Sequence, residues 1–289
     1  MNLDFTEAEI QRYSRHILLA EVGGTGQAKL REARVLIVGA GGLGSPLALY
    51  LAAAGVGTIG LVDDDVVELS NLQRQIAHAT TDLGHPKIAS AAAAMRAINP
   101  EIAVETHATR IDAANAREMV AGYDIVCDGS DNFATRYAVS DACVAAGRTL
   151  VSAAVLRFDG QISVFKPHAG LFPCYRCLYP EPPTGEAAPS CAEAGVLGAV
   201  TGVMGTLQAT EVLKEILGVG ETLAGRLLTW DALASAFHTI RIPRDPHCAS
   251  CSRLPSPLPL WEGPGEGIAA RSSEWPTPPP APPTMGGEQ

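Results

Sequence analysis

In the first half of the chain, short runs of apolar residues alternate with longer segments that are rich in alanine. Short apolar runs suit buried strands, and longer alanine-rich segments have the lengths of helices. The runs predict strands at 35–38, 58–62, 102–106, 123–127 and 149–154, and the longer segments predict helices at 88–98, 112–121 and 134–146 and one that ends at Ala54. This alternation predicts a mostly parallel α/β sheet with helices on both faces.

The pattern changes at Arg157, where regular strand–helix alternation stops. A turn is expected at 158–160, antiparallel strands at 161–165, 227–231 and 237–242, and a glycine-punctuated helix within 195–217. Period-2 alternation after a turn is typical of antiparallel strands. We therefore expect a Rossmann-like, mostly parallel sheet that is continued by antiparallel strands.

Composition divides the chain into one large predicted domain, 1–253, and a tail, 254–289. The domain would consist of a polar, helical segment at 1–33, a nucleotide-binding half at 34–155 and a second half at 156–253. The tail holds about half of the 21 prolines. Such a composition predicts disorder, with a polyproline ligand as a less favoured alternative.

Glycines follow the first predicted strand with the spacing G-x-G-x-x-G, and the residues are Gly39, Gly41, Gly42 and Gly44. Such a turn lets backbone amides at a helix start approach a phosphate. Asp63 ends the next predicted strand, where a carboxylate can accept hydrogen bonds from a ribose. The pattern predicts a nucleotide site; the alternative is a turn that only packs a helix on a strand.

Positive charges after the second strand favour a triphosphate over a dinucleotide. Asp63, Asp64 and Asp65 are followed by Arg74 and Lys87, in segments that should return towards the strand ends. A triphosphate carries more charge and usually needs Arg, Lys and a metal ion. Solvated surface charge is the alternative for both cations.

Asp131 and Asn132 follow the strand predicted at 123–127. Ligands of such sheets bind at the carboxyl ends of the strands. A carboxylate there is placed to hold Mg²⁺ beside the phosphates, because Mg²⁺ prefers oxygen ligands. Asp131 could instead cap the helix that follows.

Charge and length exclude several classes of protein. The 289 residues carry a net charge of −10, which argues against a nucleic-acid partner. The N-terminus lacks the basic and apolar regions of a signal peptide, and the apolar stretch 194–207 is short and contains glycines. We expect a cytoplasmic protein without a membrane span.

Four of the seven cysteines form two C-x-x-C pairs, Cys174 with Cys177 and Cys248 with Cys251. Four thiolates form a closed tetrahedral Zn²⁺ site, which is structural because no position remains for a substrate. Two redox dithiols or disulfides are the alternatives, disfavoured in a reducing compartment. Cys191 stands alone after a loop rich in proline and glycine, and is either a nucleophile or an unreactive thiol.

Several of these motifs together resemble the MoeB/ThiF (HesA/MoeB/ThiF) family of E1-like adenylyltransferases, the bacterial relatives of ubiquitin-activating enzymes. The segments that carry the resemblance are Gly39-Ala-Gly-Gly-Leu-Gly44, Ser70-Asn-Leu-Gln-Arg-Gln75, Pro86-Lys87, Asp128-Gly-Ser-Asp-Asn132 and Cys174-Tyr-Arg-Cys177. The resemblance runs from about Tyr13 to Cys251. It implies ATP-dependent adenylylation of the C-terminal glycine of a small ubiquitin-like sulfur carrier that ends in Gly-Gly.

The resemblance also implies roles for individual residues. Catalysis would use Arg74, Lys87, Asp131 as a Mg²⁺ ligand, and Arg15 from the second subunit of a homodimer. Cys191 would take a thioester or persulfide link to the carrier in some members. Nucleotide binding is implied for Gly39, Gly41, Gly42, Gly44, Asp63, Asp65, Asn71, Arg74, Lys87, Asp131 and Asn132. The half at 156–253 would bind the carrier and zinc.

The resemblance leaves the pathway open. The segment from Cys191 to Gly198 looks more like the branch that serves the molybdopterin-synthase small subunit than the thiamine branch. Sulfur would come from a separate donor, such as a cysteine desulfurase or a rhodanese. Two other classes compete: an NAD(P)-dependent oxidoreductase, which leaves Arg74, Lys87 and the paired cysteines unexplained, and a non-catalytic zinc scaffold.

Overall fold

The computed structural model describes residues 3–182 and 194–254. These residues belong to one compact unit, Met1–Ser256. The predicted tail and Cys191 lie outside the described residues. No helix in the described ranges is long and apolar enough to cross a membrane.

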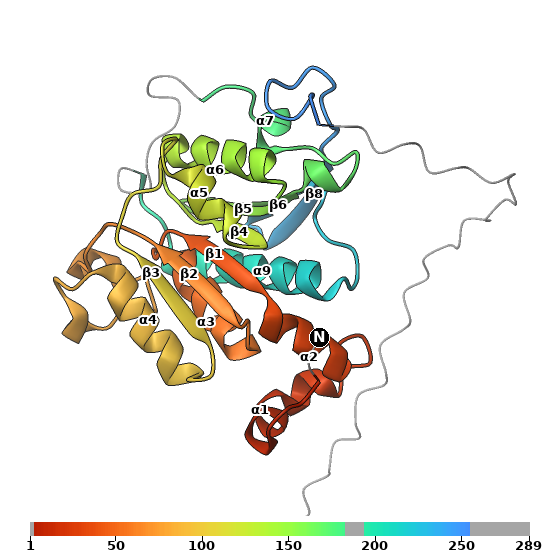
Figure 1. Cartoon of the computed structure of the whole chain (residues 1–289). Coiled ribbons are helices and arrows are strands. Elements are labelled where there is room, and N and C mark those ends of the chain that lie inside the picture. The colour runs from red at the N-terminus through yellow and green to blue at the C-terminus, as the bar shows by residue number, and fades with distance from the viewer. Residues whose placement is uncertain (1–2, 183–193, 255–289) are drawn as a thin grey trace, which may run out of the picture. The chain divides into compact units, whose positions relative to one another are not determined.

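An eight-stranded sheet forms the centre of this unit, in the order β3-β2-β1-β4-β5-β6-β7-β8 (Figure 1). The strands are β1 Arg34–Val38, β2 Thr58–Val62, β3 Ala103–His107, β4 Ile125–Asp128, β5 Thr149–Leu156, β6 Asp159–Phe165, β7 Arg226–Asp231 and β8 Ala236–Arg241. Strands β3, β2, β1, β4 and β5 are parallel, and β6, β7 and β8 pair antiparallel. The predicted fold class, a Rossmann-like sheet continued by antiparallel strands, is confirmed.

Helices cover both faces of the sheet (Figure 1). They are α1 Glu7–Ile17, α2 Gly23–Glu32, α3 Gly44–Ala54, α4 Lys87–Ile98, α5 Ala116–Ala121, α6 Phe133–Ala146, α7 Tyr175–Leu178 and α9 Gly198–Leu217, with short 3₁₀ helices η1 Leu69–Asn71, η2 Thr80–Asp82 and η3 Pro167–Ala169. Alternate residues of β1 belong to different cores. Ile37 packs with residues of α3, α4 and α9, whereas Leu36 packs with residues of α5 and α6. Strands buried on both faces explain the continuous apolar runs in the sequence.

The turn between β5 and β6 differs from the prediction. It consists of Arg157 and Phe158, with Arg157 at φ +56°, and not of residues 158–160. Gly160 lies inside β6, where an added Cβ would come within 2.5 Å of the Met204 side chain on α9. The glycine therefore permits close helix packing and does not form the turn.

The predicted helix at 112–121 begins later, at Ala116. The Asp112 carboxylate accepts hydrogen bonds from the backbone N–H groups of Ala114 and Asn115. A side chain that bonds the local backbone in this way competes with the first helical turn. The helix start is thereby displaced towards its C-terminal end.

Hydrogen bonds connect helix α1 to the C-terminal ends of α3 and α4. The Asn99 amide donates to the Tyr13 hydroxyl at 2.8 Å and to the carbonyl of Ala52, also at 2.8 Å. Arg12 donates to the carbonyl of Ile98 at the end of α4. Buried hydrogen bonds of this kind fix the position of a helix, because an unpaired buried group is costly.

Candidate functional site: a polar cleft and a cysteine cluster

A cleft lies at the carboxyl ends of β1, β2 and β4. Most of the residues predicted to bind a nucleotide line it: Gly39, Gly41, Gly42, Asp63, Asp65, Arg74, Lys87, Asp131 and Asn132. Three others, Arg15, Gly44 and Asn71, are not in its lining, and Cys191 lies outside the described residues. The strand order explains the gathering, since residues that follow parallel strands meet at one edge of the sheet.

The glycine turn after β1 is required by space and by backbone conformation. Gly39 has φ +93°, in the left-handed region that favours glycine. A Cβ on Gly44 would lie 1.9 Å from the Gly39 carbonyl oxygen, and one on Gly42 would lie 3.1 Å from the Thr201 side chain of α9. Gly44 therefore supports the turn from within α3 without lining the cleft.

Asp63 closes the glycine turn with its own carboxylate. Its Oδ2 accepts from the Ala40 N–H at 2.7 Å, and its Oδ1 accepts from the Asp65 N–H at 2.8 Å. Burial raises the pKa of Asp63 above its ordinary value, although both backbone hydrogen bonds act in the opposite direction. Each oxygen keeps a second lone pair that a ribose hydroxyl can use.

Lys87 and Arg74, two of the basic residues that line the cleft, differ in their surroundings. The Lys87 ammonium donates to Asp65 Oδ2 at 2.7 Å, and its side chain is only 8% exposed, against 66% for Asp65. Among the residues that the structure describes, Arg74 is held by a single hydrogen bond, to the Ser70 carbonyl at 3.0 Å. Lys87 is thus a fixed charge at the start of α4, and an anion can replace the exposed Asp65 beside it.

Asn132, and not Asp131, caps α6. The Asn132 side-chain oxygen accepts from the Thr135 N–H at 2.9 Å, as an N-cap does. The Asp131 carboxylate is exposed and makes no recorded hydrogen bond or ion pair with the described residues. The alternative role of Asp131 as the cap is therefore taken by its neighbour, and its oxygens are available to a cation.

Asp128, for which no role is predicted from the sequence, organises the loop beside Asp131. This carboxylate is 1% exposed and accepts from the Ser130 N–H, the Ser130 hydroxyl and the Ser152 hydroxyl. Gln208 of α9 donates to the Asp128 carbonyl at 3.0 Å. Two signals in the sequence could have identified it: its position at the end of a strand, shared with Asp63, and its place in the segment Asp128-Gly-Ser-Asp-Asn132.

Gln75 was also missed. It lines the cleft, is 4% exposed, and its Oε1 has no hydrogen-bond partner among the described residues. A buried polar atom without a partner is costly, so a ligand that supplies one would gain from the contact. Arg110 and Arg136 line the cleft as well. Gln75 follows Arg74 directly, which is the signal that could have identified it.

A second hollow, of about 760 Å³, adjoins the cleft over β5, β6 and β7. Both hollows are lined by Asp131, Arg136 and Val155. The aromatic side chains of Tyr175 and Trp230 line the second hollow. An extended chain with a terminal carboxylate could lie in this hollow and end at the cleft.

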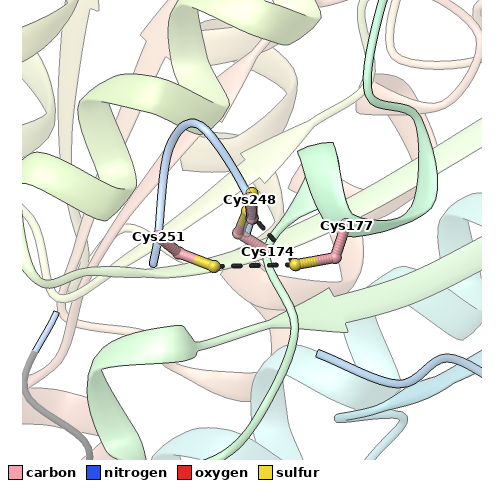
Figure 2. Close-up of side chains that lie close together, drawn as sticks. All are labelled: Cys174, Cys177, Cys248 and Cys251. Atoms are coloured by element: carbon pink, nitrogen blue, oxygen red, sulfur yellow. Dashed lines mark hydrogen bonds between the residues drawn. The ribbon is translucent and has the colours of Figure 1, made fainter. Parts of the chain in front are cut away.

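The four paired cysteines form one cluster (Figure 2), and they are not part of the cleft's lining. Cys174 is the N-cap of α7 and Cys177 lies within that helix, whereas Cys248 and Cys251 lie in the loop after β8. Their sulfur atoms all lie within 4.8 Å of one another, with three pairs at 3.5, 3.5 and 3.8 Å. Tetrahedral zinc with bonds of about 2.3 Å separates its sulfurs by about 3.8 Å, so these residues fit the ion.

Ionisation in the cluster also suits a metal. The hydrogen bond with Cys177 and burial raise the pKa of Cys174, and the same hydrogen bond lowers the pKa of Cys177 to about 5. The Asp245 N–H donates to the Cys177 sulfur at 3.4 Å, which stabilises a thiolate there. Thiolates are the form that binds a metal.

Most of the chain matches known proteins. A model described as the ThiF family matches residues 13–251. The Adenylyltransferase and sulfurtransferase MOCS3 of Bos taurus is 55% identical over 249 residues, which are 86% of this chain and 54% of that protein. The Sulfur carrier protein adenylyltransferase of Thermus thermophilus is 48% identical over 255 residues, 87% of this chain and 94% of that protein.

The chain spans about half the length of the MOCS3 relatives that it matches. The SAMP-activating enzyme E1 of Haloferax volcanii is 49% identical, over 87% of this chain and 92% of that protein. Among solved structures, E. coli MccB with ATP superposes with a TM-score of 0.74 at 26% identity, over 83% of this chain and 74% of that one.

Proposed function

Because the chain belongs to the ThiF family, we propose that it uses ATP to adenylylate the C-terminal carboxylate of a small ubiquitin-like sulfur-carrier protein. The names of the Bos taurus and Thermus thermophilus relatives support this reaction. The observation that carries the proposal is the cleft, where a glycine turn, two cations and a free carboxylate meet. Such a set neutralises and orients a triphosphate better than a dinucleotide.

In the proposed reaction the carrier's carboxylate attacks the α-phosphate of ATP, and pyrophosphate leaves. No protein nucleophile is needed, because the task is to position two anions and to stabilise charge in the transition state. The glycine turn and the N-terminus of α3 bind phosphate, and Asp63 accepts from the ribose. Lys87 and Arg74 neutralise the charge that develops on the departing pyrophosphate.

We assign Mg²⁺, the usual partner of ATP, to Asp131. Its carboxylate is exposed in the cleft and has no recorded partner among the described residues, which suits a hard oxygen ligand. Bound Mg²⁺ would supply charge neutralisation at the phosphates. Asn132 keeps its amide N–H groups for the nucleotide while its oxygen caps α6.

The carrier's tail is proposed to enter by the second hollow. This hollow meets the cleft at Arg136, whose guanidinium donates to the Ser130 carbonyl and faces both spaces. An extended Gly-Gly terminus has no side chains to obstruct such an entry. On this proposal 34–155 binds the nucleotide and 156–253 binds the carrier and zinc.

A second copy of the chain is proposed to complete the site. Arg15 is exposed on α1 and does not line the cleft of its own chain, so it would act only across a homodimer. Asn71 would support the site from behind, since its amide oxygen accepts from the Glu68 N–H. Zinc would hold the cysteine cluster together, and Cys191 remains a candidate for a covalent link.

The persulfide of a sulfur donor, such as a cysteine desulfurase or a rhodanese, would then attack the adenylate, release AMP and form an acyl disulfide. A second thiol would reduce that disulfide, which leaves the thiocarboxylate on the carrier and a disulfide on the thiols. The molybdopterin-synthase small subunit is the preferred carrier, and the thiamine carrier is the alternative. Both ATP and reduced thiols are available in the cytoplasm, where we place the reaction.

The test is exchange of radiolabelled pyrophosphate into ATP by the purified protein, with each candidate carrier in turn. Exchange that depends on the molybdopterin-synthase small subunit is expected. A carrier that lacks its terminal glycine is the matched control and should support none. A zinc-loaded, folded protein that exchanges pyrophosphate with neither carrier would contradict the proposal and favour a scaffold.

A further inference from the structure

His78 occupies an unusual place behind the cleft. It is 9% exposed, does not line the cleft, and makes two side-chain hydrogen bonds. Its Nε2 lies 2.9 Å from the carbonyl oxygen of Ala40, inside the glycine turn. Its Nδ1 lies 2.9 Å from the hydroxyl of Ser90 on α4. The ring therefore connects the two elements that carry the cleft's phosphate-binding groups.

The direction of one hydrogen bond is fixed by chemistry. A carbonyl oxygen only accepts, so Nε2 carries a proton and donates to Ala40. The Ser90 hydroxyl lies between His78 and Asp82, whose Oδ2 it approaches at 2.7 Å. These contacts hold the ring in one orientation, with Nε2 towards Ala40 and Nδ1 towards Ser90.

Ala40 is thus held through the two peptide groups on either side of its Cα atom. Its N–H donates to Asp63 and its carbonyl accepts from His78, at 2.7 and 2.9 Å. Gly41 and Gly42, which follow it, line the cleft. The Ala40 carbonyl and the Gly41 N–H belong to the same planar peptide group. A carbonyl fixed by His78 therefore also fixes the direction of the Gly41 N–H, which can meet a bound anion.

These hydrogen bonds, together with the backbone of α4, form a closed circuit that includes Lys87. From Ala40 the circuit passes through Asp63 and Asp65 to the Lys87 ammonium. From Lys87 it continues along α4 to Ser90, one helical turn away, and returns through His78. The glycine turn and the lysine therefore keep a fixed relative position.

We propose that His78 is a positioning residue for the phosphates of the nucleotide, which fixes the peptide group between Ala40 and Gly41 and connects it to the helix that carries Lys87. The inference rests on the proposed use of ATP. His78 touches no substrate itself. Loss of its bond to Ala40 would loosen the amides that meet phosphate, while leaving the remainder of the cleft unchanged.

Two substitutions of His78 distinguish its hydrogen bond to Ala40 from its hydrogen bond to Ser90. In His78→Gln the amide nitrogen can replace Nε2 and retain the bond to Ala40. In His78→Asn the shorter side chain can meet only Ser90, and the buried Ala40 carbonyl loses its donor. His168→Asn is the matched control, because that histidine lies on η3, outside the cleft lining.

The measurement is calorimetric binding of ATP, AMP and adenosine to the full chain. His78→Asn is expected to weaken ATP and AMP by about tenfold, the usual effect of leaving a buried carbonyl unpaired, and adenosine by less than about twofold. His78→Gln should bind ATP within about threefold of the unaltered protein. His168→Asn should match the unaltered protein for all three ligands.

Unchanged ATP affinity in His78→Asn would overturn the inference, and so would equal weakening of ATP and adenosine, which indicates general damage. If His78→Asn does not fold, Ser90→Ala decides: it should weaken ATP but not adenosine, and unchanged ATP affinity refutes the connection. An unaltered protein that binds no ATP would instead refute the proposed function.

Discussion

The cysteine cluster and the cleft hold their polar atoms in opposite ways. In the cluster, four like groups face one another, and the nearby Arg244 guanidinium donates to the carbonyl of Cys251 and not to a sulfur atom. In the cleft, acids, a lysine and backbone amides are already paired with one another. The first arrangement is incomplete without a cation, and the second is preformed for an anion.

This difference separates stability from ligand binding. Four crowded thiols gain most when a metal accepts their charge, so the cluster's contribution belongs to folding. The cleft's groups are oriented before a ligand arrives, so their contribution belongs to affinity and rate. Substitutions in the cluster should therefore change the stability of the fold, and substitutions in the cleft should change ligand affinity and reaction rate.

The largest expected effect is on the cluster. Replacing Cys248 with serine should abolish stoichiometric zinc and remove a metal contribution on the order of 10 kcal/mol to the free energy of unfolding. Metal content by mass spectrometry and urea unfolding measure it. Cys143→Ala is the control: that cysteine is buried in α6 away from the cluster, so it should keep zinc at a smaller cost in stability.

The next effect should appear in the cleft, on rate and not on stability. Arg74→Ala should lower pyrophosphate exchange by on the order of 100-fold, because it removes one charge that stabilises the transition state. Its melting temperature should stay near that of the unaltered protein. Arg96→Ala, on the exposed side of α4, is the control and should exchange normally. Normal exchange by Arg74→Ala would remove that residue from the mechanism.

Gly44→Ala should affect both properties and so test how separate they are. The added methyl group would meet the Gly39 carbonyl, and relieving this clash should cost about 1–3 kcal/mol and displace the turn. Weaker ATP binding and a lower melting temperature are expected together. Gly202→Ala on α9 meets nothing within 4 Å, and should be neutral or stabilising by about 0.5–1 kcal/mol.

The smallest effect is the pH dependence that His78 gives to stability. Burial lowers the pKa of His78 below 6.5, and Lys87 acts in the same direction. The unfolded chain therefore takes up a proton at higher pH than the folded one, and stability is lost as pH falls below about 6.5. The loss is at most about 1.4 kcal/mol per pH unit.

His78→Gln cannot take up this proton, so its stability should fall less steeply between pH 7 and pH 5. Urea unfolding of both proteins across that range measures the difference, and zinc release at low pH cancels because both share the cluster. Parallel pH profiles would show that the folded and unfolded states bind this proton equally.

The fold could be predicted from the sequence where the apolar pattern is strong. Both faces of β1, β2 and β4 are buried, and their continuous apolar runs reveal them. The turn before β6 was placed wrongly, because a glycine signals either a turn or a close approach. At Gly160 the neighbour that decides is Met204, more than 40 residues away.

The parts of the site that could be predicted are those that show in the residue type or in a position at the end of a strand. The spacing of the two C-x-x-C pairs identifies four ligands of the same chemical type, and the four cysteines do lie together. The bond from His78 to Ala40 could not be predicted, because its acceptor is a backbone carbonyl and the sequence carries no signal for which carbonyl a side chain meets. Asp128 was missed for the same reason, since serines and a backbone amide hold it.

The separation of the cysteine pairs has a consequence for synthesis on the ribosome. Cys174 emerges 74 residues before Cys248, which at about 5–20 residues per second is a delay of several seconds. In that interval the chain supplies α9, β7 and β8, and the second pair follows directly after β8. The nascent chain therefore carries an open dithiol for seconds, and the metal can be enclosed only once the last strand has been made.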